Sequence, residues 1–66
     1  MTRFEKDLQT AKTDLEELDF ILRKRRAELD EIDRKGRCEK NGFRRQCLAQ
    51  EYARLEAQYN ILSEYI

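Results

Sequence analysis

Apolar side chains recur every three or four residues along the first half of the chain. The series consists of Phe4, Leu8, Ala11, Leu15, Leu18, Leu22, Arg25, Leu29 and Ile32. Alternating gaps of four and three residues are the heptad spacing of helices that pack side by side, and only Arg25 breaks the apolar character. Thr2 and Glu5 form a T-x-x-E capping box before the series, which marks a helix start. The pattern predicts one helix over about residues 3–35.

A second series with the same spacing follows the segment GRCEKNG, residues 36–42. It runs through Arg45, Leu48, Tyr52, Leu55, Tyr59, Leu62 and Ile66. Its phase is displaced by two residues from the first series, which a heptad insertion of three or four residues does not explain. Glycine often ends helices, and Asn-Gly favours turns. The sequence therefore predicts a loop over residues 36–42 and a second helix over about 43–65.

Folding the chain at this loop places the two series face to face. In an antiparallel pair the numbers of facing residues have a constant sum, here 77. The layers are Ile32 with Arg45, Leu29 with Leu48, Arg25 with Tyr52, Leu22 with Leu55, Leu18 with Tyr59, Leu15 with Leu62, and Ala11 with Ile66. The predicted fold is all-α, an antiparallel two-helix hairpin of the coiled-coil type in one domain, residues 1–66. Arg25 is expected to stack on Tyr52 or to reach its hydroxyl; the alternative is that it extends to water at a weak layer.

The composition agrees with a helical chain that has little core of its own. Charged residues make up 42% of the sequence and proline is absent, as in long helices and coiled coils. A chain of this length hides only about 60% of the surface of its unfolded form, so help from a second chain is expected. No apolar run approaches the ~20 residues of a membrane span, and no export signal begins the sequence. No membrane partner and a cytoplasmic location are therefore expected.

Charge is unevenly distributed, although the formal net charge is zero. Residues 1–22 carry three basic and six acidic side chains, residues 23–45 carry ten and five, and residues 46–66 carry one and three. The loop end is therefore basic and the open end acidic, which favours an antiparallel homodimer of hairpins, a four-helix bundle with two-fold symmetry. The candidate partner-binding residues are the apolar ones outside the two series, Phe20, Ile21, Phe43, Ile61 and Tyr65. Either a second copy or a different protein would cover them.

The sequence offers little for catalysis. Histidine is absent, Ser63 is the single serine, and neither cysteine has a neighbouring base to activate it. Cys38 and Cys47 are too few for a zinc site, and secreted disulfide-bonded domains carry more cysteines. No enzyme activity, metal, cofactor or structural disulfide is expected.

Two functions remain. In the first, the chain is a non-catalytic interaction module, an adaptor or inhibitor that binds a partner protein through its helix faces. Short helical hairpins of this kind resemble small phage- or plasmid-encoded regulators that bind a host protein.

In the second, RNA or DNA phosphates bind the basic residues around the loop, while Phe43 is available to stack on a base. These residues are Arg23, Lys24, Arg26, Arg34, Lys35, Arg37, Lys40, Arg44 and Arg45. The predicted architecture is similar to that of Rop, a plasmid protein whose helical hairpins dimerise into a bundle that binds paired RNA loops, although no sequence motif is shared. The interspersed acidic residues and the neutral total charge favour the first function.

Overall fold

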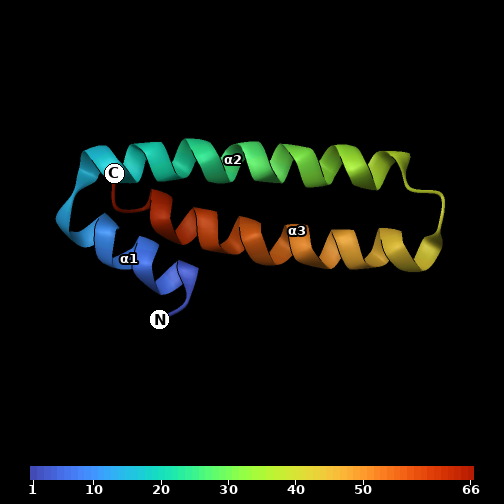
Figure 1. Ribbon diagram of the computed structural model, residues 1–66, viewed down its shortest axis with the longest axis horizontal. Coiled ribbons are helices and arrows are strands. Elements are labelled where there is room, and N and C mark those ends of the chain that lie inside the picture. The colour runs from blue at the N-terminus through green and yellow to red at the C-terminus, as the bar shows by residue number, and fades with distance from the viewer.

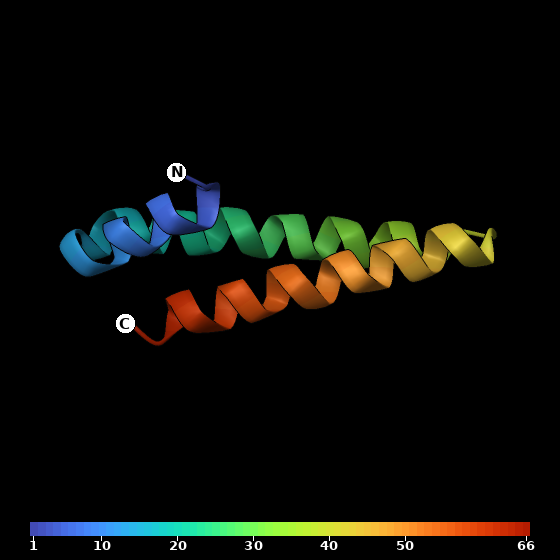
Figure 2. The same cartoon turned by 90° about the horizontal axis from the view of Figure 1, so that it is seen from below.

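The computed structural model describes all 66 residues and contains three helices and no strand (Figure 1). Helix α1 spans Arg3–Thr13, α2 spans Leu15–Cys38 and α3 spans Gly42–Ser63. Helices α2 and α3 run antiparallel along the molecule, and α1 folds back along the first part of α2 (Figures 1 and 2). The molecule is a rod with dimensions of 42 × 20 × 17 Å. The fold is all-α, but it has three helices where the sequence predicted a two-helix hairpin.

The prediction of one continuous helix over residues 3–35 is wrong, because the chain breaks at Asp14. The backbone of Asp14 is extended, with φ of −145° and ψ of 99°. Its carboxylate accepts hydrogen bonds from the amides of Glu16 and Glu17, both at 3.1 Å, and so caps the start of α2. Its own amide donates to the Thr10 carbonyl at 2.7 Å and closes α1. Aspartate is a good N-cap, and here that role takes precedence over the unbroken heptad spacing.

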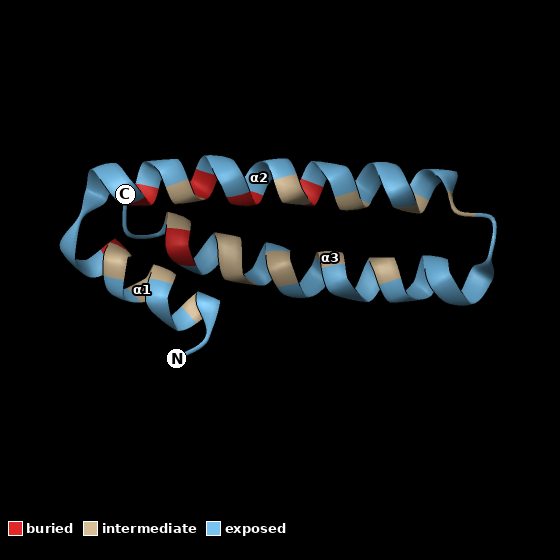
Figure 3. Ribbon diagram, in the orientation of Figure 1, coloured by how far each residue is buried: buried red, intermediate tan, exposed pale blue.

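The buried core lies at the open end of the rod, where all three helices meet (Figure 3). One buried cluster contains Ala11, Leu18, Leu22 and Leu62. Partly buried residues packed against this cluster are Phe4, Leu8, Ile21 and Tyr59. Leu62 is the only buried residue of α3, so the loop end of the rod buries much less apolar surface than the open end.

The register between α2 and α3 differs from the predicted one by about one helical turn. Leu62 packs with Leu18 and Leu22, whereas the predicted partner of Leu62, Leu15, is 59% exposed. Arg25 of α2 donates a hydrogen bond to Gln58 of α3, and their numbers sum to 83. The numbers of residues in contact therefore sum to 80 or more rather than 77.

The shifted register follows from a shorter loop than the sequence predicted. Helix α2 continues through Gly36, which has no positive φ, and leaves only residues 39–41 between the helices. The Asn41 side chain caps α3 by accepting a hydrogen bond from the Arg44 amide at 3.1 Å. The Arg45 guanidinium donates two hydrogen bonds, at 3.1 and 2.8 Å, to the Glu39 carbonyl. Helix α3 begins one residue before the predicted second helix and ends two residues before its predicted end.

Candidate interaction surface

Arg25 joins the three helices instead of packing in a two-helix layer. It is 3% exposed and lies on α2. Its guanidinium donates to the Asp7 carboxylate of α1 at 2.7 and 2.8 Å and to the Gln58 side-chain oxygen of α3 at 3.0 Å. It also lies 5.9 Å from the centre of the Phe4 ring, within cation–π range. Arg25 therefore contacts Asp7, Gln58 and Phe4 where the sequence predicted contact with Tyr52. The alternative prediction, in which Arg25 extends to water, is wrong because the residue is buried.

A second ion pair holds α1 against α2 from a more exposed position. The Arg3 guanidinium donates to both carboxylate oxygens of Glu28, each at 2.9 Å. This bidentate hydrogen bonding raises the pKa of Arg3 above its ordinary value. The folded-back position of α1 therefore depends on polar contacts as well as on the apolar cluster at the open end.

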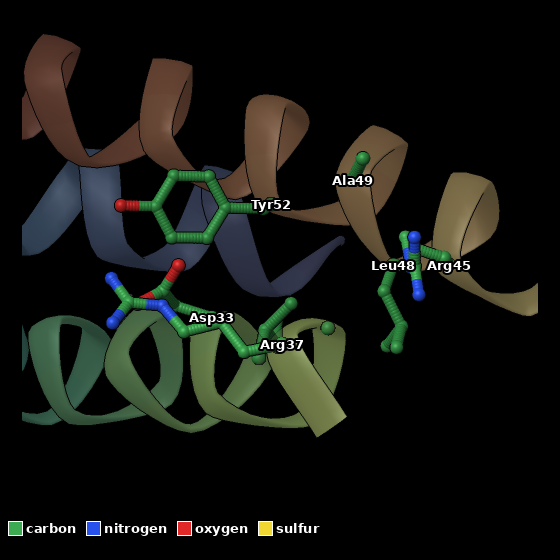
Figure 4. A pocket seen from close by; sticks show the side chains of 8 residues that line it. Asp33, Arg37, Arg45, Leu48, Ala49 and Tyr52 are labelled. Atoms are coloured by element: carbon green, nitrogen blue, oxygen red, sulfur yellow. The ribbon is translucent and has the colours of Figure 1, made fainter. Parts of the chain in front are cut away.

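The loop end of the rod carries an open groove of about 300 Å³ between α2 and α3 (Figure 4). The Tyr52 ring comes from α3, and the Asp33–Arg37 ion pair, at 3.0 Å, comes from α2. Desolvation of the Tyr52 hydroxyl, followed by the charge of Glu56, raises the pKa of Tyr52 above its ordinary value of 10.0. The polar side chains that line the groove are Tyr52, the Asp33–Arg37 ion pair and Arg45.

The predicted nucleic-acid-binding residues do not form one free basic surface. Four of them pair with an acidic residue one turn away, at 3.0 to 3.5 Å: Arg23, Arg26, Lys35 and Arg37. Arg45 is bound to the loop carbonyl of Glu39. Arg45 makes no ion pair within the chain, and neither do the other four predicted residues, Lys24, Arg34, Lys40 and Arg44. Exposed pairs contribute only about 0–1 kcal/mol, so a phosphate could still compete for the paired residues.

Four of the five predicted partner-binding residues are exposed. Phe43 is 75% exposed and Phe20 is 63% exposed, and Ile61 and Tyr65 are also open to solvent. The fifth, Ile21, is half-buried and packs against the core cluster, where it supports the fold. Sequence reasoning missed the exposure of Leu15 and Ile66, because both follow the heptad series and were placed in layers that the structure does not form.

Helix α3 carries an exposed face that we call the outer stripe. It consists of Phe43, Cys47, Gln50, Arg54, Ala57 and Ile61. At 100° per residue these six positions fall within about 80° of one another and point about 150° away from the side that faces α2. All six are exposed, and Figure 3 shows that most of α3 is exposed along its length. Four of its six residues, Phe43, Cys47, Ala57 and Ile61, are apolar and share one helix face, which is the signal in the sequence that could have indicated it.

The chemistry of the remaining side chains adds no further site. Cys38 and Cys47 are both free and exposed. No group of three or more cysteine, aspartate or glutamate side chains is arranged so that it could hold a metal ion. None of the three helices has the length and apolar character that crossing a membrane requires. No known protein family, curated protein or solved structure matches this chain.

Proposed function

We propose that this chain is a non-catalytic interaction module, an adaptor or inhibitor that binds a partner protein through its exposed helix faces. The observation that carries the proposal is the outer stripe of α3, where Phe43 and Ile61 remain exposed on a chain of only 66 residues. Large apolar and aromatic side chains dominate the energetics of protein interfaces. Phe43 and Ile61 lie on the same face near opposite ends of α3, so a partner helix or groove that follows α3 could contact both of them.

The proposal of a non-catalytic role rests on side-chain chemistry. The chain has no histidine to serve as a general base at neutral pH. The hydroxyl of its only serine, Ser63, donates a hydrogen bond to the Asn60 carbonyl at 2.9 Å, one turn back along α3. A serine held in this way has no adjacent base to activate it as a nucleophile.

Nucleic-acid binding is the second candidate function, and one observation favours it. Phe43 is exposed at the start of α3, and the neighbouring cations Lys40 and Arg44 make no ion pair within the chain. An aromatic ring beside free cations can stack on an unpaired base and bind its phosphate. The four ion-paired basic residues weaken this candidate, because their charge is already partly neutralised.

Affinity capture of the tagged chain from its native cells, with and without nuclease, tests both candidates. The wild type is compared with Ile61→Asp, which places a charge on the outer stripe, and with Arg44→Glu, which reverses a free charge at the loop end. We expect a protein that is retained after nuclease treatment, lost with Ile61→Asp and kept with Arg44→Glu.

Recovery that consists mainly of nucleic acid, and that falls with Arg44→Glu but not with Ile61→Asp, would overturn the protein-binding proposal in favour of the second candidate. Circular dichroism of both variants controls for folding. Because both substituted residues are exposed, we expect each variant to keep the helicity of the wild type.

A further inference from the structure

Helix α3 carries apolar residues on two faces, and the chain covers only one of them. The inner face packs towards α2 and places Leu62 in the core cluster. The outer stripe repeats gaps of four, three, four, three and four residues from Phe43 to Ile61, and each of its residues is exposed. A helix with two such faces is suited to lie between two neighbours. Within one molecule neither α1 nor α2 covers the outer stripe.

We propose that the outer stripe packs against the same stripe of a second copy of this chain, antiparallel and related by a two-fold axis. This inference rests on the proposed function and deepens it, because it names the partner of the outer stripe. In a two-fold antiparallel helix pair, facing residues have a constant sum, which for this stripe is 104. The register pairs Phe43 with Ile61 of the second copy, Cys47 with Ala57 and Gln50 with Arg54.

The size and polarity of the paired side chains suit this register. The outer layers join the large apolar residues Phe43 and Ile61, which supply most of the apolar surface to be buried. The next layers inward join the small residues Cys47 and Ala57, which allow the helices to approach closely. The two layers nearest the axis are polar, and polar residues at one level of an otherwise apolar helix pair favour a single register.

Charge complementarity supports the antiparallel orientation at the centre of the stripe. Neither Arg54 nor Glu51 makes an ion pair within the chain. Their numbers sum to 105, so the register places Arg54 of one copy beside Glu51 of the second copy, and the reverse. Two ion pairs related by the axis would then satisfy four charges that have no partner in the single chain.

The ends of the rod support the same orientation. Residues 23–45 at the loop end carry ten basic and five acidic side chains, and residues 46–66 carry one basic and three acidic. The register brings Lys40, just before α3, level with Glu64 of the second copy. A parallel pair would set the basic loop ends against each other, and it would align the dipoles of the two α3 helices.

A cysteine cross-link tests the register directly. In a Cys38→Ser background, Ala57→Cys places a thiol opposite Cys47 of the second copy. Under oxidised glutathione we expect a covalent dimer with two symmetric disulfides on a non-reducing gel. Ala49→Cys is the matched control, because residue 49 lies on the same helix but on a different side from the outer stripe. We expect the control to give no such dimer.

Sedimentation equilibrium tests the association without a cross-link. We expect the wild type to dimerise reversibly and Ile61→Asp to weaken the dimer at least tenfold with unchanged helicity. Phe20→Asp, on the exposed surface of α2, is the control and should leave the dimer unchanged. A dimer that does not cross-link through Ala57→Cys would overturn the antiparallel register.

A wild type that stays monomeric at several hundred micromolar would overturn the inference as a whole. The proposed function is tested separately, by the capture of a cellular protein. A monomeric chain that still loses its captured cellular protein with Ile61→Asp would leave the interaction module standing and exclude the second copy as its partner. A dimer that captures no other protein from its native cells would remove the adaptor role and leave the dimer, measured by sedimentation and cross-linking, as the sole interaction of the outer stripe.

Discussion

Buried Arg25 holds α1 against α2 through its ion pair with Asp7. A charged residue that is 3% exposed needs both a counter-ion and hydrogen-bond acceptors, which Asp7 and Gln58 supply from two other helices. Asp7 is itself largely buried, with 14% of its side chain exposed. The pair is therefore better shielded from solvent than the exposed one-turn ion pairs along α2, and its removal should have a larger effect.

A double-mutant cycle on this pair measures that effect. Arg25→Met leaves the Asp7 carboxylate without a counter-ion, and we expect it to lower the free energy of unfolding by about 3 kcal/mol. The double variant Arg25→Met, Asp7→Leu removes both charges and should recover most of the loss, because a buried ion pair can often be replaced by apolar groups of similar volume. Urea unfolding followed by circular dichroism gives the four free energies. A double variant as unstable as Arg25→Met alone would show that Gln58 or Phe4 matters more than the counter-ion.

At the scale of a helix, Gly36 is an exception to the rule that glycine often ends helices. The sequence predicted that this glycine ends the first helix, yet α2 continues to Cys38. The φ of Gly36 is not positive, and a Cβ added there would meet no atom within 4 Å. The conformation is therefore open to any residue, and the glycine only adds conformational entropy to the unfolded chain.

We expect Gly36→Ala to stabilise the protein by about 0.5–1 kcal/mol, the difference in helix propensity between the two residues. The midpoint of urea unfolding measures the change. Gly42→Ala, in the first turn of α3, is a useful comparison, since a Cβ there also meets no atom within 4 Å and the position is helical. A clear loss of stability with Gly36→Ala would indicate that the chain turns at residue 36, as the sequence predicted.

The helical character of the chain could be predicted because heptad spacing is local and repeats many times. The break at Asp14 could not, since aspartate suits both an exposed helix position and an N-cap. The contacts that hold α1 back join Arg25 to residues 18 and 33 positions away, which no local pattern reveals. The exposure of Phe43 and Ile61 followed from their positions outside the apolar series. The half-buried state of Ile21 did not, because it depends on the core that α1 completes.

At the scale of the whole molecule, the apolar core is concentrated at one end of the rod. The buried cluster draws on α1, α2 and α3 near the two chain termini, whereas α3 has no buried residue closer to the loop than Leu62 (Figure 3). The loop end is held instead by Leu29 on α2, by half-buried side chains and by the polar contacts around Glu39. Apolar burial is the dominant favourable contribution to folding, so the two ends should differ in stability.

Matched leucine substitutions on α3 test this asymmetry. Leu62 is completely buried, and Leu62→Ala should cost about 2–5 kcal/mol because it removes packed methyl groups and leaves a cavity among three helices. Leu48 is only half-buried beside the open loop-end groove, so the same substitution there should cost less than half as much. Urea unfolding measures both losses, and amide hydrogen exchange should be faster around Leu48 than around Leu62. Equal losses would mean that the core extends along the whole α2–α3 contact, and that the open end has no special role in holding α1.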